Sequence, residues 1–463
     1  MHLTDAASDG RAVARHEGRV IFVERGVPGD VARVRVYQKQ KKMLIGSIET
    51  LIRPSSSRIE PVCAHFGVCG GCKWQMMAYD TQCFFKQKQV EDAFARIGKV
   101  EIGEVLPILR AGQPFHYRNK LEFTFSNKAW LTLEQIQAER QYEQRVLGFH
   151  TPQAFDKIID IDTCYLQRPV INDIRNAVRD FARVQAISFY DIRTNEGFLR
   201  NLVFRSSEHT GELMVVLIVA KDDSDTVGRI FSQIDSLFPE ITHLLWIHNP
   251  KVNSSFSDLP FRVWKGEEYI TERLGFFDFR ISPTSFFQTN PRQAAQLYGV
   301  VKAWLQASLP AGRTRHPVVY DLYSGTGSIG IFVAELADRV VGVEYVAPAV
   351  ADARENVRLN GLEHFSFHAG DMKKILTPEF VAAEGRPDVI IADPPRAGMD
   401  PKVVQRILEI APEFLIYVSC KPATQARDIE LMSEAYEVLK IQPVDMFPQT
   451  AHVENVAWLR RRQ

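Results

Sequence analysis

Apolar runs in the C-terminal part of the chain alternate with stretches of helical periodicity. After residue 317 the runs are VVYDLY, VVGVE, VIIADPP and FLIYVSC, and helical segments such as VAPAVADARENVRLNG separate them. This alternation is typical of a parallel sheet covered by helices on both faces. Two last stretches, EVLKIQPVDMF and ENVAWLRR, are predicted to complete the sheet as a hairpin. We predict a Rossmann-like α/β domain over residues 291–463.

The middle of the chain shows a different pattern. GFLRNLVFRSS and GELMVVLIVAK indicate two strands of a hairpin around SSEHTG, and LLWIHNP indicates a further strand. Helical stretches such as KQKQVEDAFARIG and INDIRNAVRDFARV are predicted to pack on this sheet. These strands and helices predict a central antiparallel α+β domain over residues 54–290. Its start is set by PSSSR at 54–58, which has the composition of a linker.

Short strands are predicted near the N-terminus. VIFVERG, VARVRVY and MLIGSIETLI, separated by turn signals such as VPGD, indicate a small OB-like β-barrel over residues 1–53. Its charge is one-sided, since Glu49 is the single acid between residues 33 and 58. The basic residues there are Arg33, Arg35, Lys39, Lys41, Lys42, Arg53 and Arg58. Such a face suits an RNA surface, and equally suits a solvated strand face.

Composition indicates a globular chain of two or three domains, since 45% of its 463 residues are apolar and 24% are charged. The 56 basic residues balance 56 acidic ones, so any nucleic-acid surface must be a local patch. No apolar run approaches the roughly 18 residues that cross a bilayer. The opening MHLTDAASDG lacks the apolar core of a signal peptide. We therefore expect a cytoplasmic protein without a membrane partner. We also expect a monomer.

A glycine-rich turn, DLYSGTGSIG, links a predicted strand to a helix. Gly325 and Gly327 would let the backbone approach a ligand, although such a turn also occurs as a plain tight connection. Glu344 ends the next strand about 20 residues later, where a carboxylate can accept hydrogen bonds from both ribose hydroxyls. Ser328 on the turn and Asp371 at the third strand end complete the predicted pocket. It suits a nucleoside cofactor without a pyrophosphate, of which S-adenosylmethionine is the common one.

Two further strand ends carry candidate catalytic groups. The prolines of DPPRAG stop one strand and hold Asp393 at the pocket mouth, where it could also serve only to stabilise a turn. The next strand ends at Cys420. A lone cysteine is more often a small buried hydrophobe than a nucleophile, but a strand end in a cofactor pocket, beside Lys421, favours a reactive thiolate. In AHVENVAWL, Glu454 is the candidate base and His452 a lesser one, although a strand glutamate is more often an ordinary exposed residue.

With these motifs the chain resembles the RNA uracil-5-methyltransferases, which act on tRNA or ribosomal RNA. The resemblance covers nearly the whole chain and rests, in order, on CAHFGVCGGCKWQ, YRNKLEFTF, SFFQTN, DLYSGTG, DPPRAG, SCKPATQARD and HVEN. It implies that the Cys420 thiolate adds to carbon 6 of uracil, which makes carbon 5 nucleophilic enough to take a methyl group. It implies that Glu454 then removes the carbon-5 proton. The residues it implies for contact with S-adenosylmethionine, in a class I methyltransferase domain, are Gln288, Tyr323, Glu344 and Asp393.

Six cysteines are present, and three of them, Cys63, Cys69 and Cys72, lie within ten residues. In a reducing compartment, C-x5-C-x2-C with a distant fourth cysteine suits an iron-sulfur cluster or a structural zinc ion. Resemblance to the cluster-bearing members of the family implies that these three and Cys164 hold a [4Fe-4S] cluster, with Cys83 as the spare. The cluster is expected to organise the fold or the RNA surface.

The chain departs from the family pattern in two places. The family usually has Asn after its nucleophile and this chain has Lys421, so the surroundings of the thiolate are expected to differ. The barrel resembles the family's TRAM-type RNA-binding module, but Met1 falls where its first strand should be under way, which would leave the barrel incomplete. Because the tRNA branch typically lacks both cluster and barrel, the resemblance favours 23S ribosomal RNA as substrate, with tRNA as the alternative.

Two other functions stay open on the sequence. An amino-methyltransferase on adenine or guanine uses a D-P-P-aromatic motif, but here Arg396 takes the aromatic position. A cluster-containing RNA-binding protein without activity is the other, and the intact candidate residues argue against it. A uracil target would have to leave its stack, as a flipped or single-stranded base, to reach Cys420.

Overall fold

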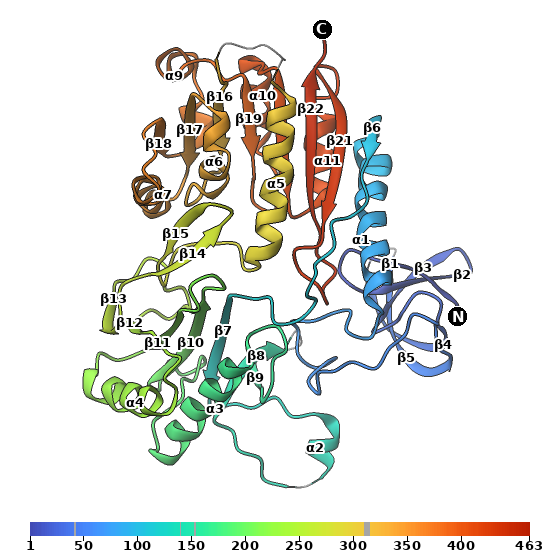
Figure 1. Ribbon diagram of the computed structural model, residues 1–463. Coiled ribbons are helices and arrows are strands. Elements are labelled where there is room, and N and C mark those ends of the chain that lie inside the picture. Colours follow the sequence, from blue (N-terminus) through green and yellow to red (C-terminus); the bar gives the residue numbers. More distant parts are fainter. Residues whose placement is uncertain (41–42, 139, 152–153, 310–314) are drawn as a thin grey trace.

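The structure is a computed structural model that describes residues 1–40, 43–138, 140–151, 154–309 and 315–463. Within these residues the chain forms sheets of eight, seven and five strands and one two-stranded hairpin. Figure 1 shows the eight-stranded sheet with its helices at the top, the seven-stranded sheet below it, and the five-stranded sheet beside helix α1. In the described part of the chain, no helix has the length and apolar content to span a bilayer.

The eight-stranded sheet forms the C-terminal α/β unit, with strand order β18-β17-β16-β19-β20-β22-β21-β6. From β18 to β20 all neighbours pair in parallel, and β22 pairs antiparallel with both β20 and β21. The predicted parallel sheet and its closing hairpin are confirmed. The strands are β16 (Val318–Leu322), β17 (Arg339–Glu344), β18 (Phe365–Ala369), β19 (Val389–Ala392), β20 (Phe414–Ser419), β21 (Tyr436–Val444) and β22 (Glu454–Arg461).

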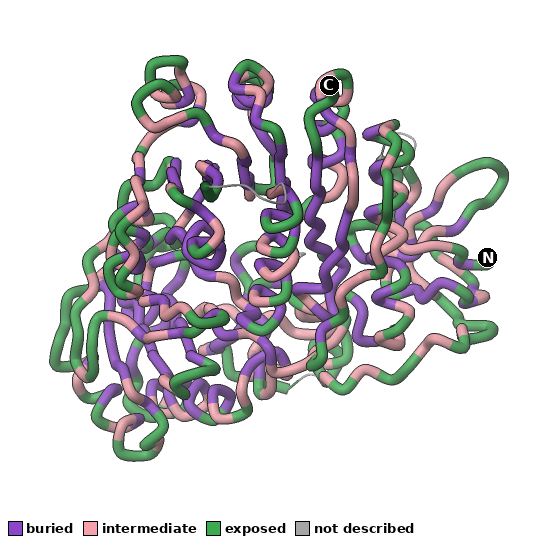
Figure 2. The backbone as a smooth tube through the Cα atoms, turned by 45° about the horizontal axis from the view of Figure 1, so that its top comes forward, coloured by how far each residue is buried: buried purple, intermediate pink, exposed green. Residues whose placement is uncertain are grey.

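Helices cover both faces of this sheet, which is why its inner strands β16, β19 and β20 are buried along most of their length (Figure 2). Leu297 of α5 and Val350 of α7 belong to the apolar core on one face. Val403 of α10 and Ile429 of α11 belong to the core on the other. The helices are α5 (Pro291–Ala307), α6 (Ser328–Phe332), α7 (Ala347–Leu359), α8 (Met372–Ile375), α9 (Pro378–Glu384), α10 (Pro401–Ile410) and α11 (Pro422–Glu430), with a 3₁₀ turn over Ala334–Leu336.

A segment from early in the chain completes the C-terminal sheet. β6 (Ile102–Val105) pairs in parallel with β21. Helix α1 (Tyr79–Ala93) and the π-helical turn Phe94–Gly98 after it pack against α11, and buried Phe94 shares the core of Ile429. The division of the chain at residues 53 and 290 stays a prediction. The C-terminal sheet itself is not continuous in sequence, since β6 comes from the segment before residue 290.

The central sheet has the order β13-β12-β11-β10-β7-β8-β9 and is antiparallel except for the pair β11 and β12. The predicted hairpin is present as β10 (Leu199–Ser206) and β11 (Leu213–Val219). Helices α3 and α4 cover one face, and the hairpin of β14 and β15 packs between the other face and α5. The remaining elements are β7 (Lys120–Ser126), α2 (Leu133–Gln137), β8 (Val146–Thr151), β9 (Ala154–Asp160), α3 (Pro169–Val184), α4 (Ser224–Leu237), β12 (His243–His248), β13 (Phe261–Lys265), β14 (Ile270–Leu274) and β15 (Phe277–Ile281).

The N-terminal sheet has the order β1-β2-β3-β5-β4. A bridge between His2 and Val31 links the first strand to β4, so the two edges of the sheet meet. Two strands, β1 and β2, precede those that the sequence pattern indicated. The strands are β1 (Leu3–Ala6), β2 (Ala12–His16), β3 (Arg19–Glu24), β4 (Val31–Gln40) and β5 (Met43–Arg53). The OB or TRAM type of this sheet stays a prediction.

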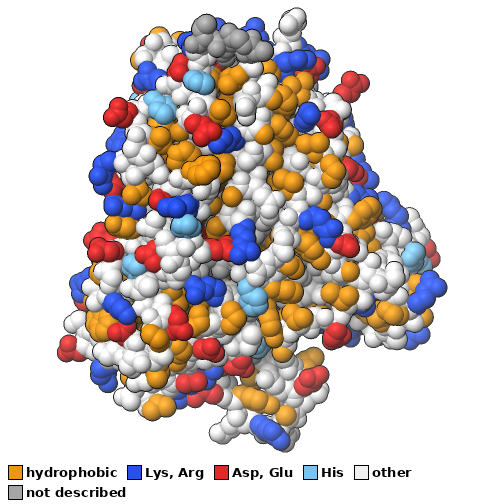
Figure 3. All heavy atoms as spheres, in the orientation of Figure 1, with side chains coloured by type: hydrophobic (Ala, Val, Ile, Leu, Met, Phe, Trp, Pro, Cys, Tyr) orange, Lys and Arg blue, Asp and Glu red, His pale blue; other side chains and the backbone are white. Residues whose placement is uncertain are grey.

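The basic residues of this region differ in their surroundings. Arg33 and Arg35 are exposed on β4, whereas Arg58 pairs with the carboxylate of buried Asp30 at 2.6 Å and so holds the linker to the sheet. Lys41 and Lys42 lie outside the described residues. On the face seen in Figure 3, Lys and Arg side chains are interspersed with Asp and Glu.

Candidate active site

The register of the C-terminal sheet brings the two candidate catalytic residues together. Ser419, the last residue of β20, pairs with Asn455 of antiparallel β22. Cys420 and Glu454 are the next residues on the two strands, so they face each other at the same edge. Asp393 follows β19, whose Ala392 pairs with Tyr417 of β20. The three side chains therefore lie at the carboxyl edge of the parallel strands, where ligands bind in open α/β sheets.

Cys420 is a half-buried thiol in an electronegative setting. Burial, followed by the charges of Glu454 and Asp393, raises its pKa to about 11. Arg396 opposes this change through its charge and a hydrogen bond to the thiol. The sequence pointed to Lys421 as the cation that favours the thiolate, and this was wrong: Lys421 is exposed, and the cation that lowers the pKa of the thiol is Arg396 from the DPPRAG loop.

Two carboxyl groups face the thiol, the buried Glu454 and the half-buried Asp393. Glu454 is 5% exposed, and burial together with the charge of Asp393 raises its pKa to about 8. Burial raises the pKa of Asp393 to about 7. A carboxyl group with a pKa near the working pH can exchange protons readily, which is the property that a general base requires. The alternative role of Glu454, an ordinary exposed strand residue, does not fit its burial.

His452 is the weaker candidate base. Nη2 of Arg396 donates a hydrogen bond to the ring nitrogen Nδ1 of His452, at 3.2 Å. Burial and the charge of Arg396 lower the pKa of His452 to about 4. The imidazole therefore stays neutral at neutral pH and binds a proton much less readily than Glu454 does.

The DPPRAG loop, which carries Asp393 and Arg396, is anchored to α11. Asp428, fully buried on that helix, accepts hydrogen bonds from the backbone N–H of Met399 at 2.8 Å and from the Tyr417 hydroxyl at 2.7 Å. The Thr424 hydroxyl donates to the carbonyl of Arg396 at 3.3 Å. The motif SCKPATQARD thus supplies the nucleophile and also the supports of the neighbouring loop, a role that its sequence did not reveal.

The loop between β21 and β22, which leads to His452 and Glu454, is held from several sides. The backbone N–H groups of Lys73 and Trp74 donate to the carbonyl of Gln449 at 2.8 and 3.0 Å. The side chain of Gln449 is paired with that of Gln82 on α1, with Gln82 Nε2 donating to Gln449 Oε1 at 3.0 Å. The cysteine-rich segment therefore contacts the loop that carries the candidate base.

A buried ion pair supports the same loop. Lys86 of α1 and Asp445 are both fully buried, and their charged atoms lie 2.5 Å apart. The Tyr79 hydroxyl donates to the second carboxylate oxygen of Asp445 at 2.8 Å. Gln293 of α5 donates to the backbone carbonyl of Asp445 at 2.9 Å. This network fixes the start of the loop against two helices.

The glycine turn has the backbone shape that close approach to a ligand requires. Gly325 and Gly327 adopt φ of 54° and 78°, and no heavy atom lies within 4 Å of where a Cβ at Gly325 would be. Glu344 Oε2 accepts a hydrogen bond from the Gly325 N–H at 3.0 Å. Tyr323, just before the turn, also has positive φ, at 63°, which is strained for an aromatic residue. Strain of this kind is typical of functional sites.

Buried polar atoms beside the turn lack partners among the described residues. These atoms are Oδ1 of Asp321 and Oγ of Ser324. Burial raises the pKa of Asp321 to about 7. Such groups are costly to bury unless something binds them, so this pocket fits a polar nucleoside cofactor. Ser328 contacts the hydroxyl of Tyr298 at 3.0 Å, which links α6 to α5.

The remaining candidate cofactor residues lie around this pocket. Asp371 follows β18 and accepts the Lys373 N–H at the start of α8. Gln288 is half-buried just before α5, and its backbone carbonyl accepts a hydrogen bond from the Asn119 side chain at 3.2 Å. Among the described residues, no hydrogen bond joins the Gln288 side chain to the other candidates. The roles of all six cofactor candidates stay predictions.

The four predicted cysteine ligands line one cavity of about 420 Å³. Cys63, Cys69 and Cys72 come from the loop before α1, and Cys164 comes from the segment before α3. Burial, and to a lesser degree the neighbouring thiols, raises the pKa of Cys72 to about 12. In the described part of the chain, no three His, Cys, Asp or Glu side chains are grouped so as to hold a single metal ion. Cys83 is buried elsewhere, beside Tyr79 of α1.

The chain is similar in sequence to known proteins. Residues 262–462 match the family model described as tRNA (Uracil-5-)-methyltransferase. A Bacteroides thetaiotaomicron protein named as an RNA methyltransferase is 48% identical over 98% of this chain and 100% of its own length. A Porphyromonas gingivalis protein with the same name is 46% identical over 100% of this chain and 99% of its own.

A solved structure is similar over its whole length. It is the crystal structure of Pyrococcus abyssi tRNA (uracil-54, C5)-methyltransferase in complex with S-adenosyl-L-homocysteine, 29% identical to this chain, with a TM-score of 0.76 and coverage of 99% of both chains. On this similarity, and on the sequence matches, the chain belongs to the RNA uracil-5-methyltransferase family and is an S-adenosylmethionine-dependent enzyme.

Proposed function

We propose that the enzyme methylates carbon 5 of a uridine in RNA through a covalent adduct between Cys420 and carbon 6 of the base. The observation that carries the proposal is the juxtaposition of a thiol, Cys420, with a buried carboxyl of raised pKa, Glu454, at the carboxyl edge of the sheet. Methylation of an exocyclic nitrogen would need no thiol at this position.

Each proton and electron pair has a destination. The Cys420 thiol releases its proton to solvent water, and the thiolate adds to carbon 6, so that electron density moves toward carbon 5 and the carbonyl at carbon 4. Bound S-adenosylmethionine supplies the methyl group that carbon 5 takes. Glu454 then accepts the carbon-5 proton, the carbon 5–carbon 6 double bond re-forms, and the thiolate leaves. Arg396 favours the thiolate electrostatically at the start and at the end of the cycle.

The cofactor is proposed to lie along the glycine turn. Glu344 is placed to accept hydrogen bonds from ribose hydroxyls, and the unpartnered Asp321 and Ser324 atoms offer polar contacts beside it. Tyr323, Ser328, Asp371, Asp393 and Gln288 complete the proposed binding residues. Tyr323, Asp371 and Asp393 follow strands of the parallel sheet, and Ser328 begins the helix after the glycine turn, which supports this assignment.

We further propose that Cys63, Cys69, Cys72 and Cys164 hold a [4Fe-4S] cluster. Their thiols line one cavity, which supports a shared ligand. When bound, the cluster would fix the cysteine-rich segment whose Lys73 and Trp74 support the catalytic loop.

The RNA substrate has two candidates. The cysteines and the N-terminal sheet, proposed as a TRAM-type domain over residues 1–53, favour 23S ribosomal RNA through the family resemblance. The Pyrococcus abyssi enzyme, which is named as a tRNA methyltransferase, is similar in fold over 99% of this chain, and this similarity supports tRNA as the other candidate. Mapping 5-methyluridine in ribosomal RNA and tRNA from cells with and without the gene decides between them. If neither RNA loses a 5-methyluridine, the proposed function is wrong.

A further inference from the structure

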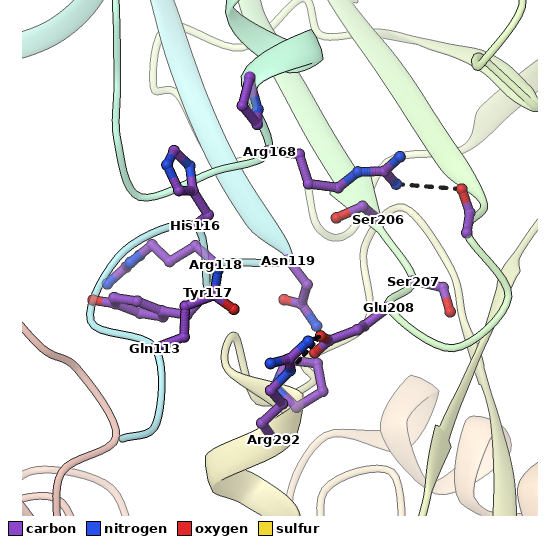
Figure 4. A pocket seen from close by; sticks show the side chains of 13 residues that line it. Gln113, His116, Tyr117, Arg118, Asn119, Arg168, Ser206, Ser207, Glu208 and Arg292 are labelled. Atoms are coloured by element: carbon purple, nitrogen blue, oxygen red, sulfur yellow. Dashed lines mark hydrogen bonds and ion pairs between the residues drawn. The ribbon is translucent and has the colours of Figure 1, made fainter. Parts of the chain in front are cut away.

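A polar cavity of about 460 Å³ lies between the central sheet and the start of α5 (Figure 4). Its volume is within the range of small-ligand sites. Arg118, Arg168 and Arg292 come from three different segments and are among its lining residues, and Glu208 is the single acid among them. Glu208 forms an ion pair with Arg292, so two guanidinium groups remain without a carboxylate partner in the cavity.

These guanidinium groups have unused donors. Arg168 donates one hydrogen bond from Nη1, to the carbonyl of Gly211 at 3.3 Å. Arg118 lies over the ring of Phe447, and its buried Nε has no partner among the described residues. Free N–H groups in a fork geometry match the oxygens of a phosphate. The cavity is therefore arranged for an anion.

Two other features of the cavity point to a ligand. Ser206 is 4% exposed and lines the cavity, and its hydroxyl makes no hydrogen bond to the described residues. Helices α3 and α5 begin at Pro169 and Pro291, both of which line the cavity, and α3 has no side-chain cap. The partial positive charge at the start of a helix adds to that of the arginines and favours an anionic ligand.

We propose that this cavity binds a backbone phosphate of the RNA strand that flanks the target uridine. The proposal rests on the proposed function. The cavity is joined directly to the catalytic segments: Asn119 on its wall donates to the carbonyl of Gln288, and Arg118 stacks on Phe447 of the loop that leads to Glu454. A phosphate held here belongs to the strand that enters the active site, and the contact fixes the position of the strand without reading its sequence.

The test compares two variants of the full-length enzyme, one expected to weaken RNA binding and the other expected to tighten it. Binding of fluorescein-labelled dodecauridylate is followed by anisotropy over a series of KCl concentrations. Arg168→Gln is expected to reduce the slope of log K against log salt by about 0.7, and so to weaken binding about fivefold near 0.1 M salt. Glu208→Gln is expected to tighten binding, because it removes the one acid and releases Arg292. Arg229→Gln, at an exposed position of α4, is the control and should leave the slope unchanged.

Calorimetric titration with inorganic phosphate separates an RNA phosphate from a free anion. If phosphate binding is lost in Arg168→Gln while the RNA salt slope is unchanged, the cavity serves a free anion and the RNA assignment is overturned. Equal slopes for Arg168→Gln and Arg229→Gln also overturn it. The proposed function is tested separately, because Cys420→Ser should abolish methylation whichever result the cavity variants give.

Discussion

Replacement of Glu454 by Gln is expected to make the enzyme more stable near neutral pH while slowing its turnover. The carboxyl is 5% exposed, and burial, with the charge of Asp393, raises its pKa from 4.5 to about 8. In the folded enzyme the group therefore holds its proton at pH values where the unfolded chain has released it. Between these two pKa values the wild type loses stability as the pH rises, and the loss is complete above the folded pKa.

The size of this effect follows from the difference between the folded and unfolded pKa of Glu454. A difference of one in pKa corresponds to about 1.4 kcal/mol, so ionisation of Glu454 costs the folded state on the order of 5 kcal/mol above pH 8. Glutamine fills the same space without ionising. Between about pH 5 and about pH 8, the wild type should lose roughly 3 to 4 kcal/mol of unfolding free energy relative to Glu454→Gln.

The assay is urea unfolding followed by tryptophan fluorescence, in the absence of S-adenosylmethionine, at the two pH values. Glu409→Gln, an exposed carboxyl on α10, is the matched control and should follow the wild type. The same Glu454→Gln protein should turn over about a hundredfold to ten-thousandfold more slowly, and it should accumulate a methylated protein–RNA adduct. A stability difference from wild type that is the same at both pH values would refute the reasoning.

Three other substitutions test separate parts of the structure. Lys86→Met leaves the carboxylate of Asp445 buried without its cation, so the unfolding free energy should fall by about 3–5 kcal/mol; adding Asp445→Leu should recover part of this loss, and no recovery would contradict the pairing. Glu344→Gln should weaken S-adenosylmethionine binding about tenfold to a hundredfold in calorimetry, and unchanged affinity would exclude the ribose contact. Cys72→Ser should remove the brown colour and visible absorption of anaerobically prepared protein, whereas a colourless wild type would contradict the cluster.

The strands that build the active site were predictable because buried parallel strands leave continuous apolar runs in the sequence. Their ends carry Asp393, Cys420 and Glu344, and the rule that ligands bind at the carboxyl edge placed these side chains together. The meeting of Cys420 with Glu454 required only the closing hairpin, which the last two apolar stretches indicated. The apolar pattern of each segment and the expected strand order were therefore sufficient to predict that these side chains lie at one edge of the sheet.

The rest depends on contacts between segments that are distant in sequence. β6 is a short edge strand with mostly exposed residues, so its pairing with β21, more than 300 residues later, leaves little local signal. Arg396 reaches Cys420 because the loop after β19 folds back and is held by Asp428. The sequence favoured adjacent Lys421 instead, since neighbours in the chain are easier to see than neighbours in space.

The bond between the sulfur of Cys420 and carbon 6 of the base is the central claim. It is tested most directly with RNA in which the methylated uridine is replaced by 5-fluorouridine, incubated with the enzyme and S-adenosylmethionine. Fluorine at carbon 5 cannot be removed as a proton, so the adduct cannot resolve. We predict a protein–RNA conjugate that survives denaturation and whose peptide map places the link at Cys420. Active enzyme that forms no such conjugate, or a conjugate in the Cys420→Ser variant, would contradict the account.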